Sequence, residues 1–306
     1  MMEFDTIVFV IAFDKPDYTS KVMDCFIASK NISNTKLVLV DNSDFECLVD
    51  KYYFKRPDVV HFKTQFKNKS KALNQAVKAF CKQNNDFIIS LDNDVEFDQF
   101  FLKKYIDSAK LKGLKYYFGT SFIVKNKPKI INQSTYRFLQ GSQKGKTDQD
   151  FKKNKMFLGF SYAFFKKQWL QVGGFDERFG PGSSMGLSGD ESIFQKKLIF
   201  AGFKPFLIES NPIVHKPLNS SYRKERVLKR VKQNGLTHGF QKIIESKPEY
   251  FKRLLGLLWI NCKLLIMFKF YDLHVQLKYL SGYLNSLIIY IKIEDKSSIY
   301  QNIKKL

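Results

Sequence analysis

The pattern of apolar positions along the first hundred residues predicts strands that alternate with helices. Residues 6–13 form an uninterrupted apolar run, which is typical of a strand buried on both faces of a parallel sheet. By the same pattern, the predicted strands are 6–13, 36–40, 59–62 and 86–91, and the predicted helices between them are 18–29 and 70–81. Strands and helices that alternate at this spacing predict right-handed βαβ units and an open, mostly parallel sheet.

The pattern continues less regularly toward residue 217. The predicted helices are 99–111 and 192–201, and the predicted strands are 116–124, 157–165 and 204–209. Residues 125–155 are polar and rich in Lys, Asn, Gln and Gly, which favours a mobile loop. Six glycines between Gly173 and Gly189 allow either a close approach of the backbone to a ligand or a hinged segment. Beyond residue 218, mixed apolar and basic periodicity predicts a helical extension that runs to Tyr290.

Charge is the strongest signal in the composition. The 306 residues carry 51 Lys and Arg against 29 Asp and Glu, a formal net charge of +22, and 44% hydrophobic residues exclude disorder for most of the chain. Residues 216–306 carry 18 basic and 6 acidic side chains, so the extension is the basic end. A basic amphipathic helix indicates binding to an anionic membrane surface, and an ordinary helical subdomain packed on the sheet is the alternative. Because 44 of the basic residues are Lys and only 7 are Arg, no specific nucleic acid is expected as a partner.

The cysteines and the apolar runs bear on the compartment. The four cysteines lie far apart, without a CxxC pair, which predicts neither a zinc site nor a disulfide framework. The N-terminus lacks the basic region of a signal peptide, and no apolar run reaches the roughly 20 residues of a membrane span. We therefore expect a cytoplasmic protein, peripheral on the inner face of the cell membrane.

Polar side chains follow the predicted strands at the points where those strands end. Asp14 follows the first strand, residues 41–44 (Asp-Asn-Ser-Asp) follow the second, and Asp92, Asn93 and Asp94 follow the fourth. A turn or a helix cap explains any one of them, but ligands of such sheets bind at the carboxyl ends of the strands. Alternation along the strand brings Asp92 and Asp94 out together with Asn93 turned away. Two carboxylates there suit Mg²⁺ or Mn²⁺, which in turn binds a diphosphate.

Several short segments, in a fixed order, resemble a known family. They are Ile11–Asp17, Val40–Ser43, Asn68–Asn74, Asp92–Asp94, Gly173–Phe179, Gly189–Glu191 and Val214–His215. The chain resembles the family-2 glycosyltransferases of the GT-A fold over residues 5–217, which implies a Rossmann-like sheet flanked by helices. The domains expected are a GT-A domain at 1–217, with a nucleotide-binding half at 1–98 and an acceptor half at 99–217, and a basic amphipathic helical tail at 218–306.

The resemblance implies roles for individual residues. Those implied to bind the donor nucleotide sugar are Ala12, Asp14, Asp41, Asn42, Ser43, Asn68, Lys71, Asn74, Asp92 and Asn93. Asp92, Asp94 and His215 are implied to hold Mn²⁺ or Mg²⁺. The acidic pair of the family ends with the catalytic base, but the pair here reads Asp190-Glu191 rather than the commoner Glu-Asp. Both therefore remain candidates for the base, and Glu191 comes first because it is the second of the pair.

Other residues leave alternatives open. Asp190 and Glu191 also suit the N-terminus of a helix by their charge, and His215 is also explained as a structural histidine. Lys69 and Lys71 could neutralise a diphosphate, and Arg178 and Arg137 could clamp a phosphate or an acidic acceptor. The opening loop departs from the family, with Phe13-Asp14 where Tyr-Asn is usual.

The function that follows is sugar transfer. We expect a metal-dependent, inverting glycosyltransferase that uses a nucleotide diphosphate sugar, specifically a UDP-sugar, and builds a surface polysaccharide. Its acceptor is expected to be a glycan or lipid-linked glycan. The alternative is a basic protein that binds membranes or nucleic acid and keeps only a vestigial sugar-nucleotide site. A nucleotidyltransferase is disfavoured because residues 11–16 lack its Gly/Arg/Lys-rich phosphate loop.

Overall fold

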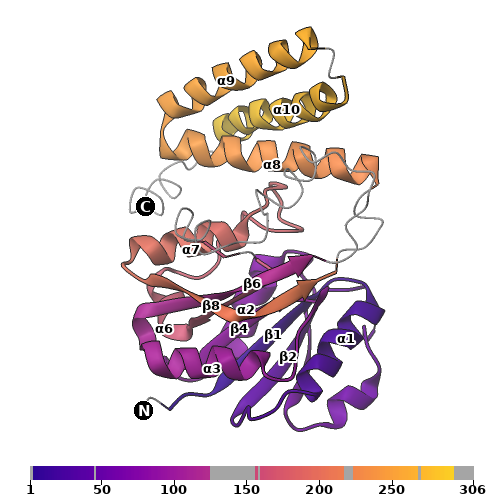
Figure 1. Ribbon diagram of the computed structural model, residues 1–306, viewed down its shortest axis with the longest axis vertical. Helices are drawn as coiled ribbons and strands as arrows, with labels where there is room; N and C mark the ends of the chain where they lie inside the picture. The colour runs from indigo at the N-terminus through magenta and orange to yellow at the C-terminus, as the bar shows by residue number, and fades with distance from the viewer. Residues whose placement is uncertain are drawn as a thin grey trace. The chain divides into compact units, whose positions relative to one another are not determined.

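The computed structural model describes residues 3–44, 46–124, 156–157, 159–216, 223–267 and 270–292. These residues divide into two units, coloured along the chain in Figure 1. The first unit contains the described residues up to 183 and those from 189 to 216, and the second contains Ser184–Ser188 and the described residues from 223 onward. The loop predicted over 125–155, with Arg137, lies outside the described residues.

The first unit is built on a mixed eight-stranded sheet in the order β3-β2-β1-β4-β7-β6-β8-β5. Its strands are β1 (Thr6–Ala12), β2 (Thr35–Asp41), β3 (Val59–Lys63), β4 (Phe87–Asp92), β5 (Val95–Glu96), β6 (Tyr116–Val124), β7 (Ser161–Phe165) and β8 (Lys204–His215). Strands β1 to β4 are parallel neighbours, β7 is antiparallel to β4 and β6, β6 and β8 are parallel, and β5 is antiparallel to β8. The predicted open, mostly parallel sheet is confirmed.

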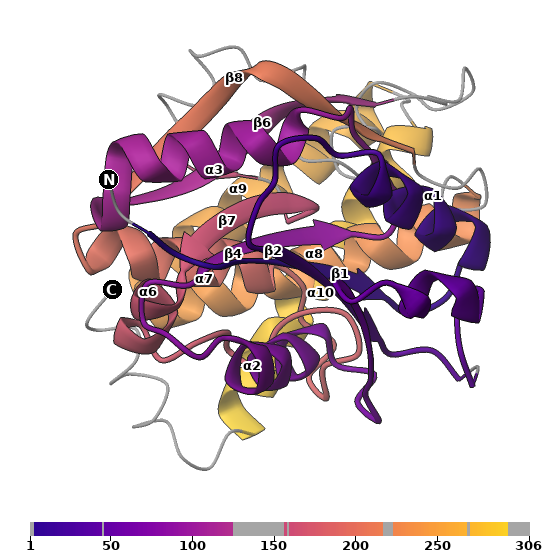
Figure 2. The ribbon, with the colours of Figure 1, turned by 90° about the horizontal axis from the view of Figure 1, so that it is seen from below.

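Helices cover both faces of this sheet. They are α1 (Pro16–Ile27), α2 (Lys69–Phe80), α3 (Phe101–Lys112), α6 (Lys166–Gln171) and α7 (Asp190–Phe200), with short 3₁₀ helices at Lys51–Lys55 and Gly113–Lys115. Successive side chains of β1 point to opposite faces, so Val8 and Val10 pack with α1 and α3. Ile7, Phe9 and Ile11 pack with α2, α6 and α7. Figure 2 shows α1 and α3 on one side of the strands and α2 on the other.

Two strands differ from their predicted bounds. Strand β7 begins at Ser161 rather than near 157, because the backbone of Phe157 bonds to a side chain instead of a neighbouring strand. Its N–H donates to Gln195 Oε1 (2.5 Å), and its carbonyl accepts from Gln195 Nε2 (2.9 Å). Strand β8 continues past 209 because, after an irregularity, Ile213–His215 pairs with the end of β6. This extension carries His215 to the end of the strand.

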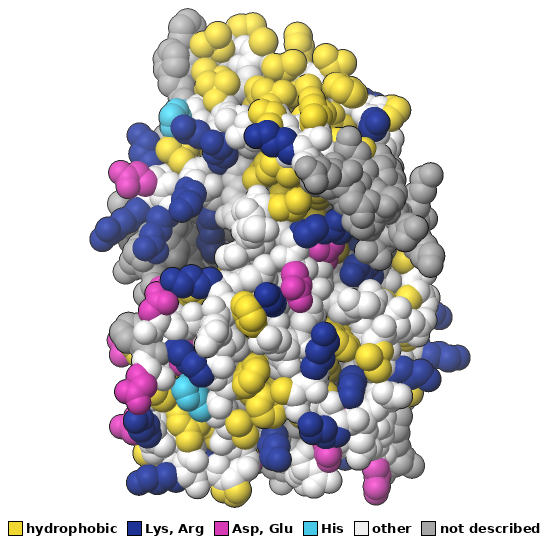
Figure 3. All heavy atoms as spheres, turned by 180° about the vertical axis from the view of Figure 1, so that it is seen from behind, with side chains coloured by type: hydrophobic (Ala, Val, Ile, Leu, Met, Phe, Trp, Pro, Cys, Tyr) yellow, Lys and Arg dark blue, Asp and Glu magenta, His cyan; other side chains and the backbone are white. Residues whose placement is uncertain are grey.

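The second unit contains the helices α8 (Lys224–Glu245), α9 (Lys247–Ile266) and α10 (Phe270–Lys292), which confirms the helical extension. Helices α8 and α10 approach so closely that a Cβ on Gly282 would lie 1.9 Å from the carbonyl oxygen of Lys232. Tyr250 of α9 and Tyr283 of α10 stack, and each hydroxyl donates to the other's carbonyl. None of the described helices is both long and apolar enough to cross a bilayer. Figure 3 shows hydrophobic side chains gathered over α9 and α10.

Candidate functional site

The carboxyl ends of three neighbouring strands lie at one edge of the sheet. The register pairs Ala12 at the end of β1 with Asp41 of β2, and Ile11 with Asp92 of β4. The segments that follow these strands therefore begin side by side. Asp14 is exposed just beyond β1, and its carbonyl oxygen accepts a hydrogen bond from Asn93 Nδ2 (2.7 Å). The topology thus brings together the strand ends that the sequence pattern selected.

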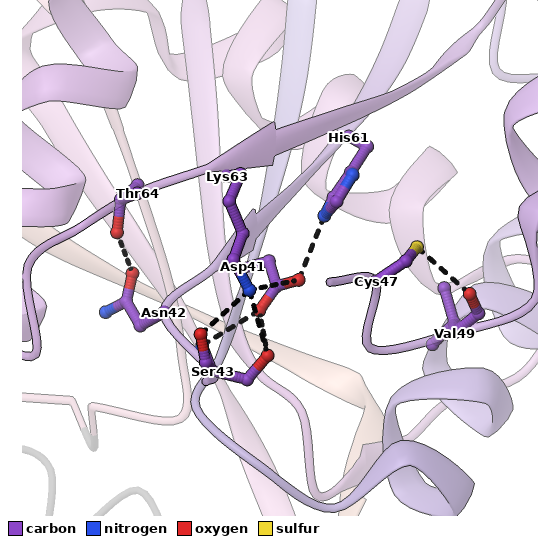
Figure 4. A network of polar contacts seen from close by, with 8 residues as sticks. All are labelled: Asp41, Asn42, Ser43, Cys47, Val49, His61, Lys63 and Thr64. Carbon is purple, nitrogen blue, oxygen red and sulfur yellow. Dashed lines mark hydrogen bonds and ion pairs between the residues drawn. The ribbon is translucent and has the colours of Figure 1, made fainter. Parts of the chain in front are cut away.

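Asp41 is the centre of a buried polar network at the end of β2 (Figure 4). One oxygen, Oδ1, accepts from the backbone N–H of Ser43 (2.9 Å) and from its hydroxyl (2.6 Å). The other, Oδ2, lies 2.9 Å from His61 Nε2 and accepts from Lys63 Nζ (3.3 Å). Burial raises the pKa of Asp41, but the bonds from His61 and Ser43 outweigh it and lower the pKa to about 2.

The saturation of Asp41 changes how it can meet a nucleobase. Both of its oxygens already accept hydrogen bonds from within the chain, so a base N–H would add to an occupied carboxylate. Lys63 and His61 are partly exposed beside it and add donors at the same place. Asn42 is engaged too, because its N–H donates to the Ala12 carbonyl and its Oδ1 accepts from Thr64 Oγ1. Asp41 and Asn42 are therefore both held by bonds from within the chain.

Asp92 and Asp94 both carry cationic partners. Lys69 Nζ donates to Asp92 Oδ1 (2.7 Å), and Lys15 Nζ donates to Asp94 Oδ2 (3.0 Å). The second oxygen of Asp94 lies 3.3 Å from His215 Nε2. Burial raises the pKa of Asp94, but His215 and Lys15 together hold it well below its usual range. Asp94 is therefore an ionised carboxylate with one face toward a lysine and the other toward an imidazole.

The loop after β1 is held in the conformation that presents Lys15. The backbone of Lys15 is left-handed (φ 70°), which is uncommon for a residue with a side chain. Asn93 turns away from its two acidic neighbours, as the strand alternation predicts, and its Nδ2 donates to the Asp14 carbonyl and to Thr19 Oγ1 (2.8 Å). Asn93 is 7% exposed, so in this structure it anchors the loop of Lys15.

The donor atoms suit a divalent cation that is shared with a substrate. Asp94 Oδ1, in the turn after β4, lies 3.3 Å from His215 Nε2 at the end of β8, and the ring of His215 stacks on Phe160 at 4.8 Å. Among the described residues no group of three or more His, Cys, Asp or Glu side chains forms a complete cage. Mg²⁺ and Mn²⁺ sites that bind diphosphates commonly use one or two protein ligands and leave the rest to phosphate and water. Asp94 and His215 fit such a site.

The acidic pair lies at the N-terminus of α7 and reaches back toward β4. Asp190 is 1% exposed, and its Oδ2 has no hydrogen-bond partner among the described residues. Lys69 is buried and feels the charges of Asp92, Asp190 and Glu191, in that order. Burial and the neighbouring Asp190 raise the pKa of Glu191 well above its usual range. One lysine thus lies between the two groups of carboxylates.

Gly159 makes room for the Glu191 carboxyl group. A Cβ built on Gly159 would lie 2.5 Å from Glu191 Cδ, so any larger side chain would have to displace that carboxyl group. We expect Gly159→Ala to lower kcat about 100-fold while the protein stays folded, because a displacement of about 1 Å in a catalytic group costs that much.

Transfer assays and a melting curve would check this effect. The matched control is Gly256→Ala, since a Cβ there meets nothing within 4 Å and alanine favours the helix. Equal activity of the Gly159 and Gly256 variants would contradict the placement of Glu191 in the site.

The remaining donor-site candidates lie on α2 and face the glycine-rich segment. Asn68 caps α2, and its Nδ2 donates to the carbonyl oxygen of Glu177 (2.6 Å). Asn74 bonds to Trp169, to the backbone of Phe175 and to Glu177. These residues join the two halves of the first unit. The further candidates are accounted for by local partners, because Lys71 lies over the ring of Phe66 and Arg178 pairs with Asp176.

The sequence did not indicate how three residues of this site act. Lys15 and Lys69 lie in recognised segments, and Lys69 was a candidate to neutralise a diphosphate, but with 44 lysines in the chain neither could be assigned to an aspartate. Gly159 lies just before β7, outside every recognised segment. Two aspartates at one strand end call for positively charged partners, so a nearby lysine could have been expected. Only the fold shows that these partners are Lys69 and Lys15.

A mixed sheet of this order, with acidic side chains beyond β4 and at the start of α7, defines a glycosyltransferase of the GT-A fold. The family model described as Glycosyl transferase family 2 matches residues 7–174, more than half of the chain. The chain therefore belongs to glycosyl transferase family 2. No curated protein matches it.

Solved structures share the fold. The mannosyltransferase PcManGT from Pyrobaculum calidifontis, in complex with GDP-Man and Mn²⁺, is similar with a TM-score of 0.57 and 14% identity, over 94% of this chain and 88% of that one. GalNAc-T7 with UDP, GalNAc and Mn²⁺ is similar with a TM-score of 0.55 and 16% identity, over 81% of this chain and 51% of that one. S. aureus TarS 1–349 is similar with a TM-score of 0.52 and 12% identity, over 76% of this chain and 65% of that one. The chain spans less than two thirds of the TarS chains that it matches.

Proposed function

We propose that this protein transfers a sugar from a nucleotide diphosphate sugar, specifically a UDP-sugar, to a glycan or lipid-linked glycan, with inversion and in a metal-dependent way. The observation that carries the proposal is the position of Lys69. Its ammonium donates to Asp92 at 2.7 Å and feels the charges of Asp190 and Glu191. A donor-side aspartate and a candidate base thus both act on the same buried lysine.

The ligands of the similar structures support the donor and the metal. TarS 1–349 is solved with UDP-GlcNAc, GalNAc-T7 with UDP and Mn²⁺, and PcManGT with GDP-Man and Mn²⁺. We propose that Asp94 and His215, with Asp92 nearby, hold Mn²⁺ or Mg²⁺ together with the donor diphosphate. Such a cation neutralises the charge that develops on the leaving diphosphate.

The roles of this chain's own residues follow from their positions. Glu191 takes the proton from the acceptor hydroxyl, because a carboxylate whose pKa is raised by desolvation and by Asp190 is a stronger base than an ordinary one. Asp190 beside it holds Glu191 in place or is the alternative base. Direct attack of that hydroxyl opposite the leaving group inverts the anomeric centre. Lys15 and Lys69 keep the aspartates of the donor side compensated until the diphosphate arrives.

Binding of the nucleotide is proposed at the ends of β1 and β2. In the network of Asp41, Ser43, His61 and Lys63, the partly exposed His61 and Lys63 offer donors to the carbonyl oxygens of a pyrimidine base, and the buried Asp41 holds them in place. Ala12 and Asn42 form the floor next to it. We propose that the protein works in the cytoplasm, at the inner face of the cell membrane, in the synthesis of a surface polysaccharide.

A thermal-shift panel tests the class, the base and the metal together. We expect UDP and UDP-sugars to raise the melting temperature in the presence of Mn²⁺, and less in its absence, because a ligand that binds only the folded state stabilises it. GDP and ADP are the matched controls. No shift with any nucleotide, combined with tight and steeply salt-dependent binding to polyanions, would instead support the vestigial site of a basic binding protein.

A further inference from the structure

Helix α9 has two apolar stripes, and only one of them packs within the second unit. The inner stripe is Tyr250, Leu254, Leu257, Asn261 and Leu264, all buried or half-buried. Its spacing of three and four residues is that of one helix face, and Tyr250 stacks on Tyr283 of α10. This stripe accounts for the packing of α9 against its neighbours.

The second stripe, here called the outer stripe, faces solvent. It consists of Phe251, Leu255, Leu258, Trp259, Cys262, Leu265 and Ile266. These positions also recur every three or four residues, so they form one continuous side of the helix. The exposures of Leu255, Trp259 and Ile266 are 67%, 72% and 74%. Contiguous apolar surface of this kind on a soluble protein indicates a binding face rather than chance exposure.

Helix α10 adds apolar surface to the same unit. Its exposed residues Leu277, Leu284, Ile288 and Ile291 are spaced by seven, four and three positions, which again places them on one side of a helix. In Figure 3 hydrophobic side chains gather over α9 and α10, with Lys and Arg side chains beside them. The apolar surface of this unit is therefore wider than a single helix.

Basic side chains accompany the outer stripe. Lys252 and Lys263 are exposed and eleven residues apart, which is three helical turns, so they line one border of the stripe. Helix α8 and the residue before it add the exposed side chains Arg223, Lys224, Arg226, Lys229, Arg230 and Lys232. The described acidic side chains of α8 to α10 are only Glu225, Glu249 and Asp272. An apolar stripe beside basic side chains complements a surface with an apolar interior and an anionic outer layer.

We propose that the outer stripe of α9 docks on an anionic lipid membrane, with α9 lying in the plane of the headgroups. Leucine, isoleucine and phenylalanine side chains enter the acyl boundary, Trp259 lies at the headgroup level, and Lys252 and Lys263 contact lipid phosphates. A second copy of this chain is disfavoured as the occupant, because the same basic border would face itself. The docking does not depend on sugar transfer.

The two tryptophans of the chain allow a direct measurement on the full protein. Trp169 is 7% exposed, so a change in emission on adding vesicles reports Trp259. We expect a blue shift and co-sedimentation with vesicles of phosphatidylcholine mixed with phosphatidylglycerol, and neither with phosphatidylcholine alone. High salt should weaken the binding, since the lysine contacts are screened.

Two pairs of variants separate the apolar and the charged contributions. Leu255→Ser with Ile266→Ser keeps the Trp259 probe and should lower vesicle partition at least about tenfold. Its control is Leu111→Ser with Phe200→Ser, which removes exposed apolar side chains of α3 and α7. Lys252→Gln with Lys263→Gln should lower partition about fivefold per charge. Its control is Lys36→Gln with Lys78→Gln, exposed on β2 and α2. Circular dichroism establishes that each variant is folded.

Several results would overturn the proposal. Equal binding to neutral and anionic vesicles would show that the basic side chains do not contribute to docking. Absence of binding to both kinds of vesicle would show that the outer stripe does not dock on a lipid membrane. An association of copies in solution that the Leu255→Ser, Ile266→Ser variant abolishes, without vesicle binding, would identify a second copy as the occupant. Binding to single-stranded RNA that survives this variant, again without vesicle binding, would identify a polyanion. Transfer to a soluble acceptor, measured in parallel, distinguishes a failure here from a failure of the proposed enzyme.

Discussion

Replacing Asp94 by asparagine is expected to remove sugar transfer. Asp94 is the only side chain among the described residues that contacts both Lys15 and His215, so its charge organises the donor side of the site. Asparagine keeps the size but loses the charge that would bind a divalent cation and its diphosphate. We expect kcat to fall about 1,000-fold, because the loss of one electrostatic contact that stabilises developing charge in the transition state typically has an effect of this size. A donor-saturated transferase assay in Mn²⁺ measures this.

The matched control for Asp94→Asn is Asp107→Asn. Asp107 is an exposed aspartate of α3 that pairs with Lys103, so it also loses a lysine partner, but far from the strand ends. The control should keep full activity, and both variants should melt cooperatively. The Asp94 variant should also lose the Mn²⁺-dependent part of its thermal shift with UDP. Unchanged transfer by a folded Asp94→Asn protein would refute the assignment of the donor site.

Replacing Glu191 by glutamine is expected to lower kcat while donor binding is kept. Glutamine fills the space beside Gly159 but cannot take a proton, and removing a general base typically costs about 100-fold to 10,000-fold. Because burial and Asp190 raise the pKa of Glu191, the wild-type rate should increase with pH as this carboxyl group loses its proton, at a higher pH than for an ordinary glutamate. Glu191→Gln should lack this acidic limb. The kcat–pH profile and the UDP thermal shift separate the two effects.

Asp190→Asn is the comparison that decides between the two acids. If Glu191 is the base, Asp190→Asn keeps a pH-dependent rate, and its acidic limb moves to lower pH because a negative neighbour has been removed. If Asp190 is the base, the acidic limb disappears in Asp190→Asn and survives in Glu191→Gln. A loss of donor affinity in Glu191→Gln equal to its loss of kcat would place this residue on the donor side and contradict its role as base.

The strand ends could be predicted because parallel sheets have simple geometry. The apolar run of β1 and the polar residues after β1, β2 and β4 place Asp14, Asp41 and Asp92 at one edge without knowledge of any side-chain contact. The contribution of His215 was harder to predict, because its place depends on a strand that continues through an irregularity after residue 208. Local periodicity does not show such a continuation, which the pairing with β6 imposes.

The partners of the site residues could not be predicted for a different reason. Lys69 comes to Asp92 across 23 residues, and Lys15 comes to Asp94 across 79. These contacts arise from the packing of α2 and α1 on opposite faces of the sheet, and sequence spacing carries no information on them. Asp41 is the clearest case: the resemblance implies that it binds the donor nucleotide sugar, but His61 and Lys63 on β3 already bond to it.

Ser184–Ser188 lies in the stretch that precedes α7 yet belongs to the second unit. The N–H of Ser188 donates to Thr237 Oγ1 (2.8 Å), and the carbonyl of Gly186 accepts from Gln233 Nε2 (3.0 Å), so α8 holds this stretch from its own side. A protein cut after residue 217 would leave the N–H of Ser188 and the carbonyl of Gly186 without these partners, two and four residues before α7 begins at Asp190. We therefore expect an exchange of the C-terminal helices between homologues to work better when residues 184–188 are exchanged with them.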